Sequence, residues 1–144
     1  MKKLFLVGIV FAMSLTISSV KAQTFTMSPV NDTVVNTATQ ACSLKLAHPY
    51  DQVTIEALVT KVSGTVAGTV TLQGTVDGVN WVTVDTTVLV SKPKVATFTA
   101  TNVATQTKIW IMDRSPYLWL KLSYTGSGTM SAILNGYLLP RAKQ

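Results

Sequence analysis

Residues 68–81 read GTVTLQGTVDGVNW, and this stretch decides the fold. Up to Val76, aliphatic residues and glycine alternate with threonine and glutamine, which is the period-two pattern of a strand with one buried and one exposed face. Asp77 and Gly78 follow, and both residue types tolerate the positive φ angles of a tight hairpin loop. Apolar residues resume at Trp81, so the stretch predicts an antiparallel hairpin.

The same alternation continues on both sides of this hairpin. Turn-forming groups of Gly, Pro, Asp and Ser separate the segments at intervals of about 8–12 residues, which is typical of sandwiches and barrels. The pattern predicts an all-β fold, a single antiparallel β-sandwich of about eight or nine strands over residues 41–144, either jelly-roll or immunoglobulin-like. The expected strands cover residues 42–47, 53–60, 69–76, 81–90, 95–101, 108–112, 117–124 and 129–139.

The composition points in the same direction. Charged residues make up only 12% of the chain, whereas 22 residues are threonine. Threonine is polar and β-branched, so it suits the solvent-facing side of a strand. Hydrophobic residues make up 47%, which is enough for a packed core. The chain therefore has the composition of a folded domain with a threonine-rich β surface.

The first 22 residues have the order of a secretory signal peptide. Lys2 and Lys3 precede an uncharged stretch, residues 4–20, and the small residue Ala22 stands before Gln23. We expect cleavage after Ala22 and export of the mature protein to the periplasm, the cell surface or the medium. The alternative is a retained membrane anchor, for which the uncharged stretch is short.

Removal of this segment changes the charge of the protein. The remaining chain has nine Lys and Arg residues and six Asp and Glu residues, which gives a net charge of +3 instead of +6. The basic residues are scattered rather than clustered, so we expect no nucleic-acid partner. We also expect no stable membrane span after cleavage.

Candidate catalytic and metal-binding groups are few. The single cysteine, Cys42, alternates with polar neighbours, which predicts a buried position on a strand. The single histidine, His48, lies in a turn, and no nucleophile motif accompanies it. Asp77, Asn80 and Asp85 surround one hairpin and are the best calcium candidates, although a turn explains the first two without a metal. We expect no enzyme activity, no cofactor and no metal.

One expected strand carries an aromatic face. If its leucines point into the core, the alternating residues lie on the opposite side, where aromatic rings beside a lysine can stack on a sugar or a partner. The alternative is plain packing, with both faces covered. The inward residues are Leu118, Leu120 and Leu122, and the candidate binding face consists of Tyr117, Trp119 and Lys121.

Residues 23–40 form a polar, extended N-terminal arm before the sandwich. Its apolar residues are few, and none of its turn signals closes it as a hairpin. Such a segment can add to an exposed sheet edge of another molecule, which makes it a candidate assembly arm. The alternative is that the arm forms the first strand of its own sandwich. Its candidate contact residues are Phe25, Met27, Val34 and Val35.

Three segments resemble β-sandwich accessory proteins of tailed-phage virions. Residues 68–82 (GTVTLQGTVDGVNWV) are similar to a strand, a tight turn and the start of the next strand in that family. Residues 115–122 (SPYLWLKL) and 126–129 (GSGT) suit its final hairpin. The resemblance extends over about residues 53–139. It implies a structural role on the surface of a particle, whereas the export signal indicates a secreted protein.

These observations define two expected functions. The first is a non-catalytic, secreted structural or adhesive β-sandwich that self-assembles or decorates a cell or virion surface. Its partners would be proteins or further copies of the chain. The second is a carbohydrate-binding module that uses the aromatic strand face, with a glycan as its partner.

Overall fold

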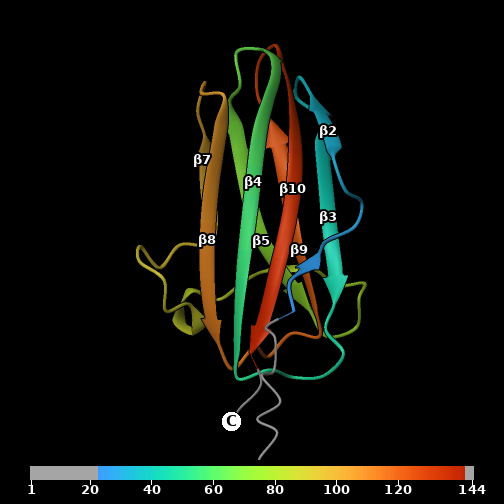
Figure 1. Ribbon diagram of the computed structural model, residues 1–144, viewed down its shortest axis with the longest axis vertical. Coiled ribbons are helices and arrows are strands. Elements are labelled where there is room, and N and C mark those ends of the chain that lie inside the picture. Colours follow the sequence, from blue (N-terminus) through green and yellow to red (C-terminus); the bar gives the residue numbers. More distant parts are fainter. Residues whose placement is uncertain (1–22, 142–144) are drawn as a thin grey trace, which may run out of the picture.

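Two antiparallel β-sheets pack face to face in the computed structural model, which describes residues 23–141 (Figure 1). The expected all-β, two-sheet architecture is thereby confirmed. The signal peptide expected over residues 1–22 lies outside the described residues. No helix among residues 23–141 has the length and apolar character needed to cross a membrane.

Sheet A is organised around the last strand of the domain, β10. One side of β10 pairs with β4 along its whole length, and the other side pairs first with β2 and then with β1. The far side of β4 pairs with β8, which is an edge strand. The strands of sheet A are β1 (Phe25–Thr26), β2 (Asp32–Val35), β4 (Gln52–Gly64), β8 (Thr105–Asp113) and β10 (Met130–Arg141).

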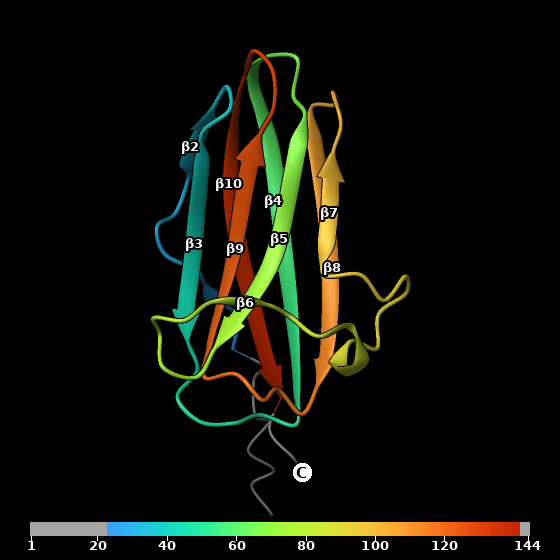
Figure 2. The same ribbon diagram turned by 180° about the vertical axis from the view of Figure 1, so that it is seen from behind.

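Sheet B lies in front in Figure 2 and is built around β9 and β5. β3 pairs with β9, β9 with β5, and β5 with both β6 and β7. The segment that joins β5 to β6 crosses the outer face of this sheet (Figure 2). The strands of sheet B are β3 (Thr39–Lys45), β5 (Gly68–Thr75), β6 (Val82–Thr83), β7 (Thr97–Ala100) and β9 (Trp119–Gly126).

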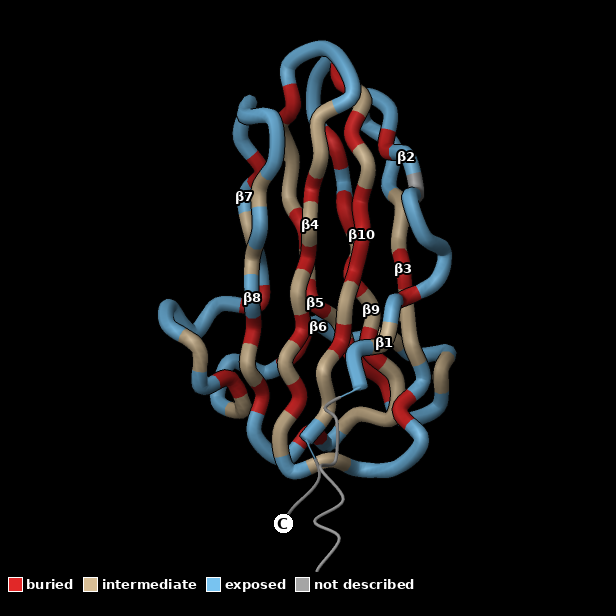
Figure 3. Tube along the Cα trace, viewed as in Figure 1, coloured by how far each residue is buried: buried red, intermediate tan, exposed pale blue. Residues whose placement is uncertain are grey.

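The core lies between the inner faces of the two sheets. Along β4, buried and half-buried residues alternate with period two (Figure 3). Leu120 and Leu122 of β9 are fully buried, as their alternation predicts, and Cys42 of β3 is buried beside them. Leu118 is only half-buried, because it precedes the first residue of the strand. Its expected place in the core row was wrong.

The two sheets approach each other closely at Gly136 of β10. A Cβ atom at this position would lie 2.7 Å from the sulfur of Met27, 2.8 Å from the sulfur of Cys42 and 2.9 Å from a methyl carbon of Leu122. These contacts are shorter than van der Waals distance. Glycine is therefore the residue that lets side chains from three strands or loops meet at the centre of the sandwich.

The prediction of one long strand over residues 81–90 is wrong. Within this segment only β6 is a strand; a 3-10 turn, η1 (Thr86–Val88), follows it, and Leu89 forms an isolated bridge with Met112. The carboxylate of Asp85 accepts a hydrogen bond of 2.8 Å from the backbone N–H of Thr87 and caps this turn. The valine and threonine content of the segment suits a strand, but the hydrogen bond from the Thr87 N–H to the Asp85 side chain takes the place of a strand-to-strand hydrogen bond.

The N-terminal arm pairs with its own domain. β1 and β2 both lie along β10, and a short bridge joins Ser28 to Ser43 of β3. Met27 and Val34 are fully buried in the core. The arm therefore forms the first strands of its own sandwich, which is the alternative that the sequence left open.

Candidate binding surface

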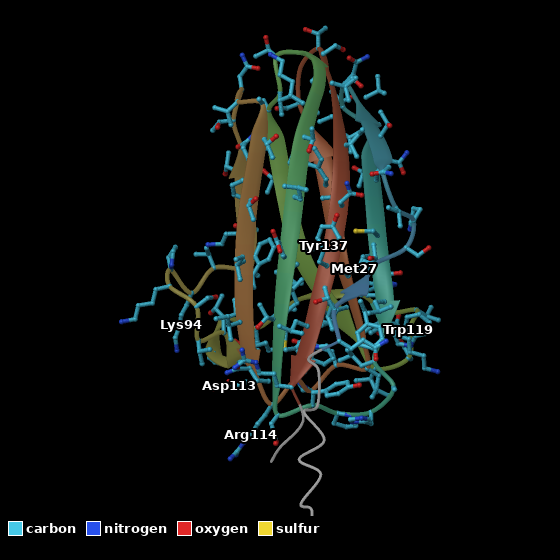
Figure 4. The ribbon with its side chains drawn as sticks, in the orientation of Figure 1. Met27, Lys94, Asp113, Arg114, Trp119 and Tyr137 are labelled. Carbon is cyan, nitrogen blue, oxygen red and sulfur yellow. The ribbon has the colours of Figure 1, made fainter. Side chains whose placement is uncertain are left out.

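Trp119 and Lys121 lie on the outer face of sheet B, opposite the buried leucines of β9. The strand register places Trp119 between Lys45 of β3 and Thr75 of β5. It is labelled in Figure 4 near the end of β3. Two of the three residues expected on the aromatic face are thus on one surface.

Tyr117 lies on the other side of the sheet, which corrects the expectation that it shares a face with Trp119. Ser115 forms a tight turn with it, because the Ser115 hydroxyl lies 3.2 Å from the Tyr117 carbonyl oxygen and 3.3 Å from its N–H. The ring then packs inward over Gly74. Its hydroxyl accepts a hydrogen bond from the backbone N–H of Asp85 at 3.3 Å.

A third aromatic ring, which is not among the residues expected on this face, takes the place of Tyr117. Trp81, at the end of the loop that follows β5, lies with its ring 4.3 Å from the Lys121 ammonium. The Lys45 ammonium lies 5.5 Å from the ring centre of Trp119. Both distances fit cation–π contacts. Partial burial lowers the pKa of Lys121. The sequence feature that indicates Trp81 as part of this surface is its position directly after the Asp77–Asn80 turn.

Asp77 fixes the conformation of this loop. Its Oδ1 atom accepts hydrogen bonds from the Thr75 hydroxyl at 2.6 Å and from the backbone N–H groups of Val79 and Asn80, both at 2.8 Å. Its Oδ2 atom accepts a bond from the Asn80 side-chain amide at 2.6 Å. The carboxylate is thus occupied by the loop itself. The turn interpretation of Asp77 therefore accounts for its contacts.

We expect the Asp77 loop to keep its structure in acid. The Thr75 hydroxyl, followed by the loop N–H groups, holds the pKa of Asp77 well below its ordinary value of 3.8. A lowered pKa means that the charged form stabilises the loop above pH 3.8 and continues to do so below it, until the carboxyl protonates in strong acid. In NMR titrations, the Val79 and Asn80 amide signals should therefore shift with a midpoint well below 3.8.

The matched control for this titration is Thr75→Val, which removes the largest contribution and keeps the side-chain volume. The midpoint should move upward, toward 3.8. A wild-type midpoint at the ordinary value would contradict the hydrogen-bond arrangement.

The same loop presents apolar side chains to solvent. Val79 is 75% exposed, Val76 is 63% exposed and Val82 is 53% exposed. Gly78 lies against the indole of Trp119, where a Cβ atom would be 3.3 Å from Nε1, so the loop rests directly on the sheet. We call these three valines together with Trp81 the loop surface. The loop bonds the Asp77 carboxylate internally and leaves the three valines exposed.

The single histidine, His48, lies between β3 and β4. The His48 ring stacks near Tyr50, with centroids 4.1 Å apart, and its Nδ1 lies 3.0 Å from the Pro49 carbonyl oxygen. Residues 23–141 contain no group of three or more His, Cys, Asp or Glu side chains placed to hold a metal ion. A cavity between β1, β3 and β10 has a volume of about 60 Å³, room for only a few water molecules.

The candidate assembly residues are divided between core and surface. Met27 and Val34 are in the core, so they are not available to a neighbouring molecule in this fold. Phe25 is half-buried on β1, and Val35 on β2 is 48% exposed. The structure therefore does not bring the four residues together on one contact face.

The chain matches no known protein-family model and no curated protein sequence.

Proposed function

We propose that the mature protein is an exported, non-catalytic structural module that attaches to a protein surface through the loop surface and the neighbouring lysines of sheet B. The observation that carries this proposal is the fixed loop with its outward valines. A contact loop whose conformation is already held by its own hydrogen bonds loses little entropy on binding. Exposed apolar side chains around an indole are the composition of an interface centre.

A protein partner suits this surface better than a sugar does. Sugar binding requires free hydrogen-bonding side chains beside the aromatic rings. Here the carboxylate of Asp77 and the amide of Asn80 are bonded to each other, and lysines lie over the rings of Trp81 and Trp119. The exposed valines of the loop gain free energy when an apolar recess covers them.

The charges define the chemistry of the partner. Lys45 and Lys121 flank the apolar loop, and the nearby Asp77 carboxylate keeps its charge but has both oxygens occupied by four hydrogen bonds within the loop. The complementary surface is an apolar recess with an acidic rim. A coat or envelope protein of the particle or cell that displays the module is the corresponding type of partner, in agreement with the phage resemblance and the expected export.

The test is retention of the purified mature protein on envelope fragments of the source organism. The variant Val76→Ser with Val79→Ser should reduce retention about tenfold or more, because it removes exposed apolar area at the centre of the contact. The matched control is Val30→Ser with Val103→Ser, which changes two valines that are 54% and 48% exposed elsewhere. It should bind like the parent.

Protease treatment of the fragments separates the two expected functions. Loss of retention after treatment supports a protein partner. Retention that survives the treatment, appears on purified insoluble polysaccharide and disappears in Trp119→Ala would favour the carbohydrate-binding module and overturn the proposal. The specific observation behind that second function is the pair Trp81 and Trp119 on one outer face. Equal retention of both double-valine variants also rejects the loop surface.

A further inference from the structure

The edge strand β8 has one side paired and the other side only partly covered. Its inner neighbour, β4, pairs with it from Thr105 to Asp113. On the outer side, the Val90 N–H donates to the Ile111 carbonyl oxygen at 2.9 Å, and the Ile111 N–H donates to the Ser91 hydroxyl at 3.3 Å. The chain itself therefore covers the lower end of this edge (Figure 1).

The direction of the remaining backbone groups follows from the ladder. In an antiparallel pair, alternate residues of one strand direct their N–H and C=O groups to the same neighbour. Ile111 directs both groups outward, so Thr105, Thr107 and Ile109 do the same. The bond of 2.8 Å from the Lys61 N–H to the Ala104 carbonyl oxygen agrees, because it shows even-numbered residues directed toward β4.

This upper half of β8 is exposed. Thr105, Thr107 and Ile109 are all exposed, and residues 105–109 include none that is buried (Figure 3). Within residues 23–141, no hydrogen bond occupies the outward N–H groups of Thr107 and Ile109. An extended strand with free N–H and C=O groups binds another extended strand.

We propose that the upper half of β8 is a self-association edge, where β8 of a second copy adds antiparallel about a two-fold axis at Thr107. Thr107 then pairs with its own symmetry mate, and Thr105 pairs with Ile109 of the other copy. Each of these residues donates one backbone hydrogen bond and accepts one. The contact is isologous, so it closes as a dimer. It uses no residue of the loop surface and does not depend on the proposed function.

The lysine on β8 selects this register. With the axis at Thr107, Lys108 lies opposite Gln106, and the Gln106 amide is held back by its hydrogen bonds to Thr101. Moving the axis by one residue would place Lys108 opposite its own symmetry mate. Like charges directly opposite each other destabilise a strand pair. The same lysine disfavours uncontrolled edge pairing.

Sedimentation velocity of the mature protein over about 10 µM to 1 mM tests the proposal. The parent should show a concentration-dependent monomer–dimer equilibrium. Thr107→Pro removes an outward N–H that sheet A does not use, so it should keep the fold and abolish the dimer. The control Thr107→Val keeps the N–H and should dimerise like the parent.

A cross-link provides the second readout, which does not depend on proline being tolerated. Thr107→Cys places two thiols at the axis, where hydrogen-bonded strand partners have Cα atoms about 5.5 Å apart, within disulfide range. Mild oxidation should join most of the protein into a covalent dimer. Thr105→Cys, whose symmetry mate is several residues along the strand, should cross-link far less.

Three results would overturn the inference. These are a parent that stays monomeric over the whole concentration range, a folded Thr107→Pro variant that dimerises like the parent, and cross-linking at position 105 as efficient as at position 107. The loop variant Val76→Ser with Val79→Ser should dimerise normally. This separates failure of the self-association edge from failure of the proposed attachment surface.

Discussion

Trp110→Ala should lower the free energy of unfolding by about 3–5 kcal/mol, which is the usual cost of truncating a large buried aromatic residue. Trp110 is fully buried on the inner side of β8. Its indole N–H donates a hydrogen bond of 2.8 Å to the Val95 carbonyl oxygen. The side chain therefore fills the core and fixes the segment that leads into β7. The substitution loses the packing, leaves a cavity and frees a carbonyl group.

The measurement is urea denaturation of the mature protein. Unfolding is monitored by backbone circular dichroism rather than by tryptophan fluorescence, because the variant lacks one tryptophan. The control is Ile109→Ala on the same strand. Ile109 is 48% exposed on the outer side, so its truncation should cost less than about 1 kcal/mol. Equal losses for the two variants would contradict the placement of Trp110 on the buried face of β8 and of Ile109 on its exposed face.

Met27→Ala should cost about 2–5 kcal/mol, although the residue lies in a segment whose sequence resembles a flexible arm. Met27 is fully buried, its N–H donates to the Gly136 carbonyl oxygen at 2.8 Å, and its sulfur faces the space that Gly136 leaves open. A large fall in the denaturation midpoint with an unchanged dependence on denaturant concentration is expected, because the loss is in packing.

Val35→Ala is the matched control in the same arm. Val35 is 48% exposed, so its truncation should change the stability by no more than a few tenths of a kcal/mol. If Met27→Ala were as stable as the parent, the arm would not belong to the core. The assembly arm would then return as the better interpretation of residues 23–40.

Alternation predicted the strands that run through the middle of each sheet. In β4, β5 and β9 the buried face repeats every second residue, because each strand has one face on the core and one toward solvent. Leu120 and Leu122 were placed correctly for this reason. The prediction failed at Tyr117 because its position is set by the Ser115 turn rather than by the pleat.

The arm was ambiguous because its partner is distant in sequence. β2 pairs Val34 with Ala132, and nothing in residues 23–40 shows that this side of β10 is open to receive it. The candidate surface was found only in part. Trp119 and Lys121 follow from the strand period, but the position of Trp81 over Lys121 depends on the path of a loop. The Asp77 hydrogen bonds determine that path, and a turn motif alone does not specify it.

The central place of β10 has a consequence for the order in which the protein folds. β10 supplies the ladder for β1, β2 and β4, so sheet A lacks its middle until residues 130–141 are available. When the chain emerges N-terminus first, from a ribosome or a translocation pore, β1, β2 and β4 cannot pair with β10 until this last strand has emerged. Closing such distant contacts is slow. Sheet A is therefore completed only after residues 130–141 are available.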